Sequence, residues 1–254
     1  MAQARQLTRE RADQCALFFD FDGTLAPVQV DPDAVRPAPG VVPALTALAD
    51  RVQRVAIVSA RPVEFLRDRF AGLHTLDLYG LYGLEQCRRG GEAVTDPAAL
   101  PWIPVMADLA ERARTELPGE VLVEYKRLSV ALHYRTARHL AERVAAWGQT
   151  VVDQLGLRVQ VGRMVVELKP PVDRDKGMVI GEALGAARCA WYFGDDVSDL
   201  KAFAALRARA AADPDFFGVC VAVDNPETGA ELASAADLTL ASPTAVGEFL
   251  ATLR

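Results

Sequence analysis

The sequence predicts an α/β protein in which a parallel β-sheet covered by helices is interrupted by an inserted α+β segment. Short apolar runs alternate with apolar residues at helical spacing near both ends of the chain, a pattern typical of parallel sheets. Between these regions lies a stretch in which apolar and polar residues alternate, as they do in antiparallel strands. The chain has 254 residues, of which 51% are hydrophobic, and this is ample for such a core.

The first part of the chain reads strand, helix, strand, helix, strand. Apolar runs at 16–19 and 55–58 are expected to be buried parallel strands, and residues 76–79 a third strand. Between them, apolar residues recur at helical spacing over 42–52 and 63–70. Because such crossover connections are right-handed, the two helices should cover the sheet.

The middle of the chain changes character. Residues 96–104 contain three prolines and predict a linker that leads into a helix. Residues 121–135 then alternate in the manner of strands, so that successive side chains face opposite sides of a sheet. One of these faces is predicted to carry Ser129, Ala131, His133 and Arg135.

A second helix and a hairpin complete this segment. The apolar spacing over 140–155 predicts a long amphipathic helix. Residues 157–168 predict a hairpin that turns at Gly162-Arg163. The insert therefore has the predicted order α-β-β-α-β-β, which gives an antiparallel sheet with two helices on one face.

Strand and helix alternation resumes after the insert. A helix is predicted from Gly177, and apolar runs at 189–193 and 219–223 predict two further strands. We therefore expect one domain built from 1–98 and 174–254, with a second domain, 99–173, inserted into it.

Composition and charge exclude several classes of protein. A formal net charge of −6 argues against a nucleic-acid binder. No apolar stretch reaches the roughly 18 residues of a membrane-spanning helix, and residues 1–13 lack the apolar core of a signal peptide. Four scattered cysteines without a CxxC pair predict reduced thiols. We expect a cytoplasmic monomer with no nucleic-acid or membrane partner.

The strongest chemical signal follows the first predicted strand. Residues 18–25 read FFDFDGTL, which places Asp20 and Asp22 where that strand ends. Ligands of α/β proteins bind at the carboxyl ends of the strands. Two crowded carboxylates repel each other, so a cation must offset them. A charged strand end that enters a turn is the alternative interpretation of the two acids taken alone.

Three weaker signals follow later in the chain. Ser59 and Arg61 come directly after the second strand, and a hydroxyl beside backbone N–H groups can bind an anion. Lys176 opens the first helix after the insert, while Asp195 and Asp199 follow the next strand. Clustered carboxylates suit Mg²⁺, which prefers oxygen ligands. Taken singly, a helix-capping serine, a solvated lysine and an acidic helix start are the ordinary alternatives.

Together and in this order, the four signals resemble the motifs of the haloacid dehalogenase (HAD) superfamily of phosphohydrolases. The resemblance implies a HAD-like Rossmannoid core, with the insert as a cap domain of the larger, C2 type. It implies that Asp20 attacks phosphorus and that Asp22 acts as acid and then base. It further implies that Ser59 and Lys176 hold phosphoryl oxygens. The implied cofactor is Mg²⁺, held by Asp20, the backbone carbonyl of Asp22, and Asp195, with Asp199 in support.

Three segments narrow the family. Residues 124–135 (EYKRLSVALHYR), 162–170 (GRMVVELKP) and 82–85 (YGLE) resemble trehalose-6-phosphate phosphatases. The resemblance implies a small sugar phosphate, trehalose 6-phosphate, as substrate and a functional link to a trehalose-6-phosphate synthase. It assigns a positioning role to His133. The substrate-binding residues that it implies are Arg61, Glu124, Lys126, Arg135 and Glu167.

Two alternatives stay open, and the sequence departs from the family pattern in places. The alternatives are a phosphatase of sucrose 6-phosphate or of glucosyl- or mannosyl-3-phosphoglycerate, and a catalytically silent sugar-phosphate-binding module. The presence of both Asp20 and Asp22 counts against a silent module. The departures are Leu200 for Glu, Ser198 for Thr, Ala60 for Gly, and Tyr82 in a segment that usually contains His.

Overall fold

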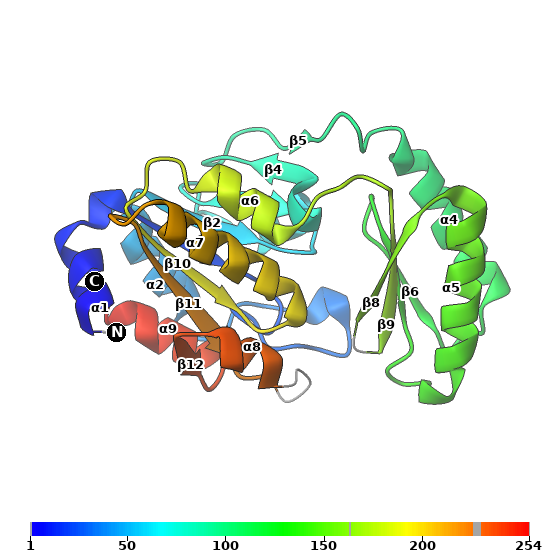
Figure 1. Ribbon diagram of the computed structural model, residues 1–254. Helices are drawn as coiled ribbons and strands as arrows, with labels where there is room; N and C mark the ends of the chain where they lie inside the picture. The colour runs from blue at the N-terminus through cyan, green and yellow to red at the C-terminus, as the bar shows by residue number, and fades with distance from the viewer. Residues whose placement is uncertain (1, 163, 226–229, 254) are drawn as a thin grey trace. The chain divides into compact units, whose positions relative to one another are not determined.

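A computed structural model describes residues 2–162, 164–225 and 230–253 of the protein. The chain divides into two compact units. The larger unit comprises Met1–Val94 and Arg174–Arg254, and the smaller comprises Thr95–Asp173. The larger has a mainly parallel sheet and the smaller an antiparallel sheet, so the predicted α/β fold with an inserted α+β segment is confirmed (Figure 1).

The main sheet has eight strands in the described part of the chain, in the order β12-β11-β10-β1-β2-β3-β4-β5. The strands from β12 to β3 pair in parallel, whereas β4 runs antiparallel to β3. The strands span β1 (Cys15–Phe19), β2 (Arg54–Val58), β3 (Asp77–Gly80), β4 (Glu85–Cys87), β5 (Val94–Thr95), β10 (Cys189–Gly194), β11 (Phe217–Val223) and β12 (Leu238–Leu240).

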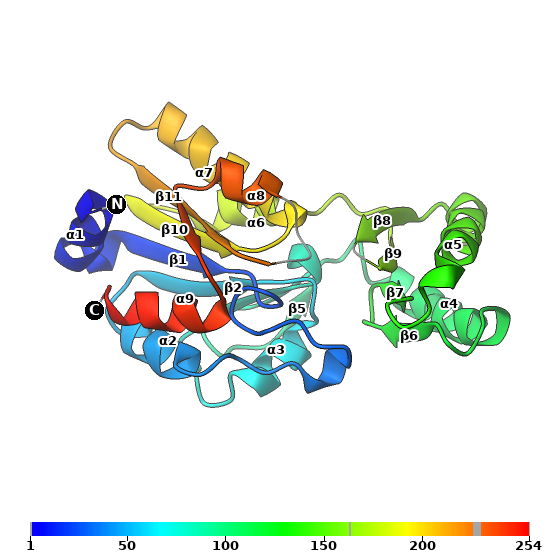
Figure 2. The ribbon, with the colours of Figure 1, turned by 90° about the horizontal axis from the view of Figure 1, so that it is seen from below.

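Helices cover both faces of this sheet (Figure 2). Every residue of β1 is buried, because its odd-numbered side chains pack into one apolar cluster and its even-numbered ones into the other. This two-sided burial explains the uninterrupted apolar runs of the sequence. The first cluster is covered by α2 (Val41–Ala49), α3 (Val63–Arg69) and α9 (Pro243–Ala251), and the second by α6 (Lys176–Ala183), α7 (Leu200–Ala212) and α8 (Ala230–Ala235).

An N-terminal helix, α1 (Ala2–Glu10), packs against this unit and was not predicted. Its Thr8 hydroxyl accepts a hydrogen bond of 2.8 Å from the indole of Trp191 on β10. Arg9 donates to the carbonyl of Thr252, just beyond α9. These contacts are polar, so the helix leaves little of the apolar periodicity on which the prediction depended.

The smaller unit contains a four-stranded antiparallel sheet of order β6-β7-β9-β8. Its core lies between this sheet and two helices, and the predicted order α-β-β-α-β-β is confirmed. Arg163, in the predicted hairpin turn, lies outside the described residues. The elements are α4 (Trp102–Glu116), β6 (Leu122–Tyr125), β7 (Val130–His133), α5 (Ala141–Leu155), β8 (Arg158–Gly162) and β9 (Val165–Lys169). Within the described ranges, no helix is both long and apolar enough to span a bilayer.

Candidate active site

The chain turns sharply after β1 and separates the first two aspartates. The backbone N–H of Asp20 still donates to Phe193 on β10, at 2.9 Å, so this residue extends the sheet. Gly23 then donates to the carbonyl of Ala26 at 2.7 Å and closes a turn. The side chain of Asp20 is 9% exposed and that of Asp22 is 31% exposed. One carboxylate is therefore buried and the other is accessible to solvent.

The loop after β2 faces the accessible aspartate. The Ser59 hydroxyl accepts a hydrogen bond of 3.1 Å from the backbone N–H of Arg61, within its own loop. It does not cap α3, which begins after Pro62. The Arg61 guanidinium donates to both oxygens of Asp22, at 2.8 Å and 2.7 Å. This fork-shaped pair restrains the Asp22 carboxylate more strongly than a single contact would.

Glu85, the last residue of the YGLE segment, has a structural role in the larger unit. Its carboxylate accepts a hydrogen bond of 2.9 Å from the backbone N–H of Val63, in the first turn of α3. A helix start offers unpaired N–H groups and favours negative charge, so this contact fixes the helix that follows the Ser59 loop. Leu81 and Tyr82 adopt left-handed φ values of 50° and 58°, and thereby direct the chain from β3 back to β4.

Lys176 lies deep in the larger unit at the first position of α6. Its Nζ atom is 2.6 Å from Oδ1 of Asp199 and 3.1 Å from Oδ1 of Asp20. Only 2% of its side chain is exposed, so the solvated-lysine interpretation does not hold here. The Asp175 carboxylate caps α6 by accepting from the N–H of Met178, which fixes the helix start that carries the lysine.

The Asp199 carboxylate accepts hydrogen bonds from four groups around it. Its Oδ1 atom accepts from Lys176 and from the Tyr192 hydroxyl, each at 2.6 Å. Its Oδ2 atom accepts from the backbone N–H groups of Asp195 and Asp196, at 3.1 Å and 3.0 Å. A carboxylate has about four lone-pair sites, and these four donors fill them. Asp199 therefore couples the lysine to the turn that follows β10.

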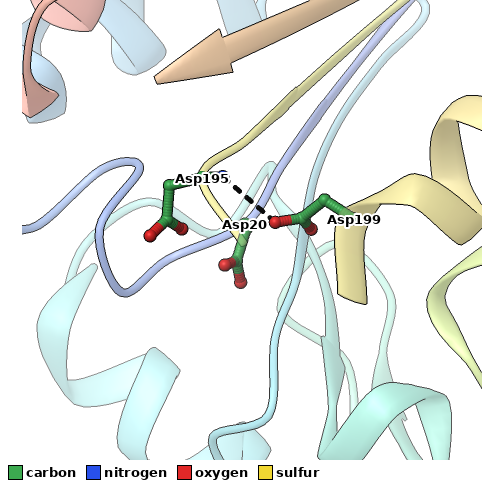
Figure 3. Close-up of side chains that lie close together, drawn as sticks. All are labelled: Asp20, Asp195 and Asp199. Carbon is green, nitrogen blue, oxygen red and sulfur yellow. Dashed lines mark hydrogen bonds between the residues drawn. The ribbon is translucent and has the colours of Figure 1, made fainter. Parts of the chain in front are cut away.

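Three buried carboxylates converge at the ends of β1 and β10 (Figure 3). Oxygen atoms of Asp20, Asp195 and Asp199 lie within 4.8 Å of one another. Lys176 is the cation that contacts two of them in the described part of the chain. Two positive charges are then lacking, which is the charge of one divalent cation. The oxygen donors also suit Mg²⁺, so the residues fit the implied metal.

The titration of these groups reflects this excess of negative charge. Burial raises the pKa of Asp20 well above its usual value, against the opposing effect of Lys176. Burial and the neighbouring Asp199 raise the pKa of Asp195 to about 7. Burial alone would lower the pKa of Lys176, but Asp199 and Asp20 outweigh it and hold that pKa above its usual value. These directions follow from desolvation, from repulsion between the carboxylates, and from attraction between the carboxylates and the ammonium group.

The smaller unit gathers a second polar cluster on one face of its sheet. Glu124 lies opposite Ala131, which in turn lies opposite Glu167, so the two glutamates share a face. Lys126 is 3.3 Å from Glu167 and 3.7 Å from Glu124. Ser129 donates to Glu167 at 2.7 Å, and a ring nitrogen of His133 lies 2.8 Å from Glu124.

One predicted residue lies in a turn, and three residues that were not predicted contact the carboxylates. Arg135 is half-buried in the turn after β7. Thr24, Tyr192 and Asn225 contact the carboxylates, although the sequence assigned them no role. Each lies on or within a few residues of a strand end, which is the signal that could have found them. Leu200, which replaces a family Glu, packs at the edge of an apolar cluster.

Gly23→Ala is expected to damage this site beyond its effect on the backbone. A Cβ atom at Gly23 would lie 1.9 Å from Oδ2 of Asp195. Gly40 has nearly the same φ, 83° against 80°, but its Cβ position has open space, with no atom of the described residues beyond its two chain neighbours within 4 Å. Gly40→Ala should therefore cost only the left-handed strain of about 1–2 kcal/mol. Gly23→Ala should cost more and also weaken Mg²⁺ binding, as thermal unfolding and calorimetry would record. Equal effects of the two variants would contradict the collision.

The stability of the metal-free chain should fall as pH rises between about 4 and about 7. In that window, Asp195 binds a proton in the folded chain, where its pKa is about 7, but not in the unfolded chain. The unfolding free energy then decreases with pH. Mg²⁺ competes with that proton, so the rise in Tm on adding Mg²⁺ should be larger at pH 8 than at pH 5. Thermal scans with EDTA or Mg²⁺ test this. Asp195→Asn should reduce the difference without abolishing it, because the pKa of Asp20 is raised as well.

The doubly covered parallel sheet, with carboxylates from two central strands gathered around one lysine, gives the larger unit the architecture of haloacid dehalogenase-like hydrolases. One such hydrolase from Bacteroides thetaiotaomicron has a solved structure that covers 94% of this chain and 99% of its own. The TM-score is 0.64 at 15% sequence identity, which shows a shared fold.

Within that class, the chain belongs to the trehalose-phosphatase family, whose model matches residues 18–243. A trehalose-phosphate phosphatase of Mycobacterium leprae is 38% identical over 256 residues, covering 94% of this chain. The chain spans only 57% of the length of that relative. The C-terminal domain of a Candida albicans trehalose-6-phosphate phosphatase shares the fold, with a TM-score of 0.77, 22% identity, and coverage of 98% of this chain and 96% of its own.

Proposed function

We propose that this chain hydrolyses trehalose 6-phosphate to trehalose and phosphate with the help of Mg²⁺. The observation that carries the proposal is the buried Asp20 beside Lys176, within 4.8 Å of the Asp195 and Asp199 carboxylates. The family supports the choice of substrate. The presence of both Asp20 and Asp22 favours a catalyst over a silent binding module, because the reaction needs one carboxylate as nucleophile and one as acid and base.

Asp20 is the nucleophile in this proposal. Its carboxylate oxygen bonds to phosphorus while the bond from phosphorus to the sugar oxygen breaks, which gives an aspartyl-phosphate. Asp22 donates a proton to the departing sugar oxygen. It then takes a proton from water, whose oxygen bonds to phosphorus and releases Asp20 and inorganic phosphate. The partial exposure of Asp22 supports this role, since the group must reach both sugar and water.

Mg²⁺, when bound, offsets the repulsion between the carboxylate nucleophile and the phosphoryl oxygens. Asp20 and Asp195 would hold it by their carboxylates, and Asp22 by its backbone carbonyl. Asp199, whose oxygens already accept four hydrogen bonds, would support the site by fixing Asp195 and Lys176.

Lys176, Ser59 and Arg61 supply the contacts to the phosphoryl group in this proposal. Lys176 offers an ammonium group beside the nucleophile. The loop of Ser59 and Arg61 lies at the end of the neighbouring strand, β2, and Arg61 reaches Asp22. Preorganised donors of this kind stabilise the charge that develops on the transferring oxygens.

We propose that residues 99–173 form a cap domain that recognises the sugar, and that 1–98 with 174–254 form the catalytic core. The division into two compact units supports this assignment. Glu124, Lys126 and Glu167 would bind the distal glucose, and Arg135 would help to close over the substrate. Carboxylates beside an ammonium group offer both acceptors and donors to sugar hydroxyls. His133 would orient Glu124.

We also propose a cytoplasmic location, a monomeric state, and a functional link to a synthase that makes trehalose 6-phosphate. Four buried cysteines in thiol form support a reducing compartment.

The decisive experiment compares phosphate release from a panel of substrates at saturating Mg²⁺. Trehalose 6-phosphate should be hydrolysed with a kcat/KM well above those of sucrose 6-phosphate, glucose 6-phosphate and glucosyl-3-phosphoglycerate. EDTA should abolish release, and Mg²⁺ should restore it. Preference for another member of the panel would contradict the proposed substrate but not the proposed phosphatase reaction. Release from none of them would overturn the proposal.

Glu167→Gln should separate recognition of the sugar from the chemistry. The buried Glu167 carboxylate accepts from Ser129 and contacts Lys126. Losing one charged hydrogen bond of about 1.5–3 kcal/mol to a sugar hydroxyl should lower kcat/KM roughly 10- to 100-fold for trehalose 6-phosphate. The same variant should hydrolyse phenyl phosphate within about twofold of wild type. The exposed Glu120 of the same unit offers Glu120→Gln as the control. Equal losses on both substrates would count against a sugar-binding role.

A further inference from the structure

The Asp195 carboxylate is held at both oxygens by uncharged side chains. The Thr24 hydroxyl donates to Oδ1 at 3.2 Å, and the Asn225 side-chain amide donates to Oδ2 at 2.7 Å. Thr24 lies in the turn after β1, whereas Asn225 lies two residues beyond the end of β11. Segments from both neighbours of β10 thus converge on one carboxylate.

This arrangement fixes the carboxylate plane while leaving its charge available. A single donor would leave the group free to rotate about its last bond, but two donors on opposite oxygens define its orientation. The Asn225 NH₂ group must face Asp195, because its carbonyl oxygen would repel the carboxylate. Each Asp195 oxygen keeps a lone-pair site for a further ligand. Asp199 differs, since an ammonium, a hydroxyl and two backbone N–H groups occupy its oxygens.

The backbone gives the Asp195 carboxylate little room to move. The Cβ position of Gly23 lies 1.9 Å from Oδ2 and 2.7 Å from Oδ1, so the turn that carries Thr24 passes directly against this group. The carboxylate is therefore bounded by the Gly23 backbone and fastened by Thr24 and Asn225.

We propose that Asn225 is a positioning residue of the cation site, which with Thr24 orients Asp195 and thereby sets the affinity for the divalent cation. This inference rests on the proposed function only in taking Asp195 as a ligand of Mg²⁺. Groups that orient metal ligands typically change metal affinity or activity by about 10- to 100-fold when they are removed. In this scheme Asn225 acts on the cation through Asp195.

The test measures Mg²⁺ binding to the 254-residue chain by titration calorimetry. Asn225→Ala should raise the Mg²⁺ dissociation constant roughly 10- to 100-fold. Thr24→Val, which removes the longer hydrogen bond, should raise it less, and Thr24→Ser should keep it near the wild-type value. Asp224→Ala is the matched control, because Asp224 is the exposed neighbour of Asn225 in the same loop. It should leave the constant within about twofold of wild type, since surface charges act weakly at a distance in salt.

Thermal unfolding separates positioning from general stability. A residue needed only for folding would lower Tm equally with EDTA and with Mg²⁺. The proposal requires that Asn225→Ala mainly reduces the gain in Tm on adding Mg²⁺, because that gain reports binding to the folded state.

The outcomes separate this inference from the proposed function. An unchanged Mg²⁺ dissociation constant in Asn225→Ala, with wild type active on trehalose 6-phosphate, would overturn the inference alone. Failure of wild type to hydrolyse any sugar phosphate while Asn225→Ala still weakens Mg²⁺ binding would overturn the function alone. Failure of wild type to bind Mg²⁺ would overturn both.

Discussion

Asp20→Asn is expected to lower the release of phosphate from trehalose 6-phosphate by at least about 10⁴-fold, because it removes the nucleophile and retains its shape. Asn cannot form the acyl-phosphate bond, and Asp199, the other carboxylate beside Lys176, already accepts four hydrogen bonds. The measurement is phosphate release at saturating Mg²⁺ over hours. The exposed Asp68 on α3 offers Asp68→Asn as the control, which should retain wild-type turnover.

The same variant should not be less stable than wild type without metal. Burial raises the pKa of Asp20, so the folded chain resists ionisation of this group more than the unfolded chain does. The contribution of Asp20 to stability therefore decreases as pH rises above its unfolded pKa near 4. A neutral Asn removes this dependence. In EDTA, the Tm of Asp20→Asn relative to wild type should increase between pH 5 and pH 8.

Together the two measurements exclude a trivial explanation. A variant that loses turnover but keeps or gains Tm has lost chemistry and not its fold. Residual turnover above about 1% of wild type would instead indicate that another group attacks phosphorus, because a lost nucleophile costs several orders of magnitude.

Much of the fold could be predicted because its central strands are buried on both faces. A strand buried on both faces needs apolar residues at successive positions. The runs at 16–19 and 189–193 therefore locate β1 and β10 to within a residue at each end. The motif residues follow those runs directly. Since neighbouring parallel strands end at one edge of the sheet, the convergence of Asp20 with Asp195 follows from topology.

The remaining contacts could not be predicted because they depend on spatial neighbours that no local pattern records. Asn225 reaches Asp195 only because β11 pairs with β10. Tyr192 has the appearance of an ordinary core aromatic, yet its hydroxyl bonds Asp199. The short antiparallel β4 likewise carries Glu85 to the start of α3, across a turn with left-handed residues. In each case the sequence shows the residue type, but the residue's partner lies on another element and cannot be predicted from the local pattern.

The charge balance of the site links stability to catalysis. Asp20, Asp195 and Asp199 together exceed the charge of Lys176, and each is buried. Removing a carboxylate relieves repulsion, while removing the lysine increases it. Variants of Asp20 and of Lys176 should therefore change stability in opposite directions while both abolish activity.

Lys176→Met is expected to destabilise the chain by about 3–5 kcal/mol, because it leaves buried carboxylates without their cation. Turnover should also be lost, since Lys176 contacts the nucleophile at 3.1 Å. The destabilisation should be smaller at pH 5 than at pH 8. The raised pKa of Asp20 lets this group take up a proton at the lower pH. Urea unfolding in EDTA at both pH values measures these differences, with Lys201→Met on the exposed face of α7 as the control.

A double variant tests whether the destabilisation of Lys176→Met comes from the lost ion pair with Asp199 or from lost packing. Lys176 and Asp199 lie 2.6 Å apart, and Asp199→Asn removes the negative charge that the missing lysine leaves exposed to repulsion. Lys176→Met/Asp199→Asn should therefore be more stable than Lys176→Met, with a coupling energy of about 1–3 kcal/mol between the two sites. The double variant should stay inactive, because neither the ammonium nor the Asp199 charge is restored. If the change in unfolding free energy of the double variant equals the sum of the changes in the two single variants, the buried pair is contradicted. The destabilisation of Lys176→Met would then come from lost packing alone.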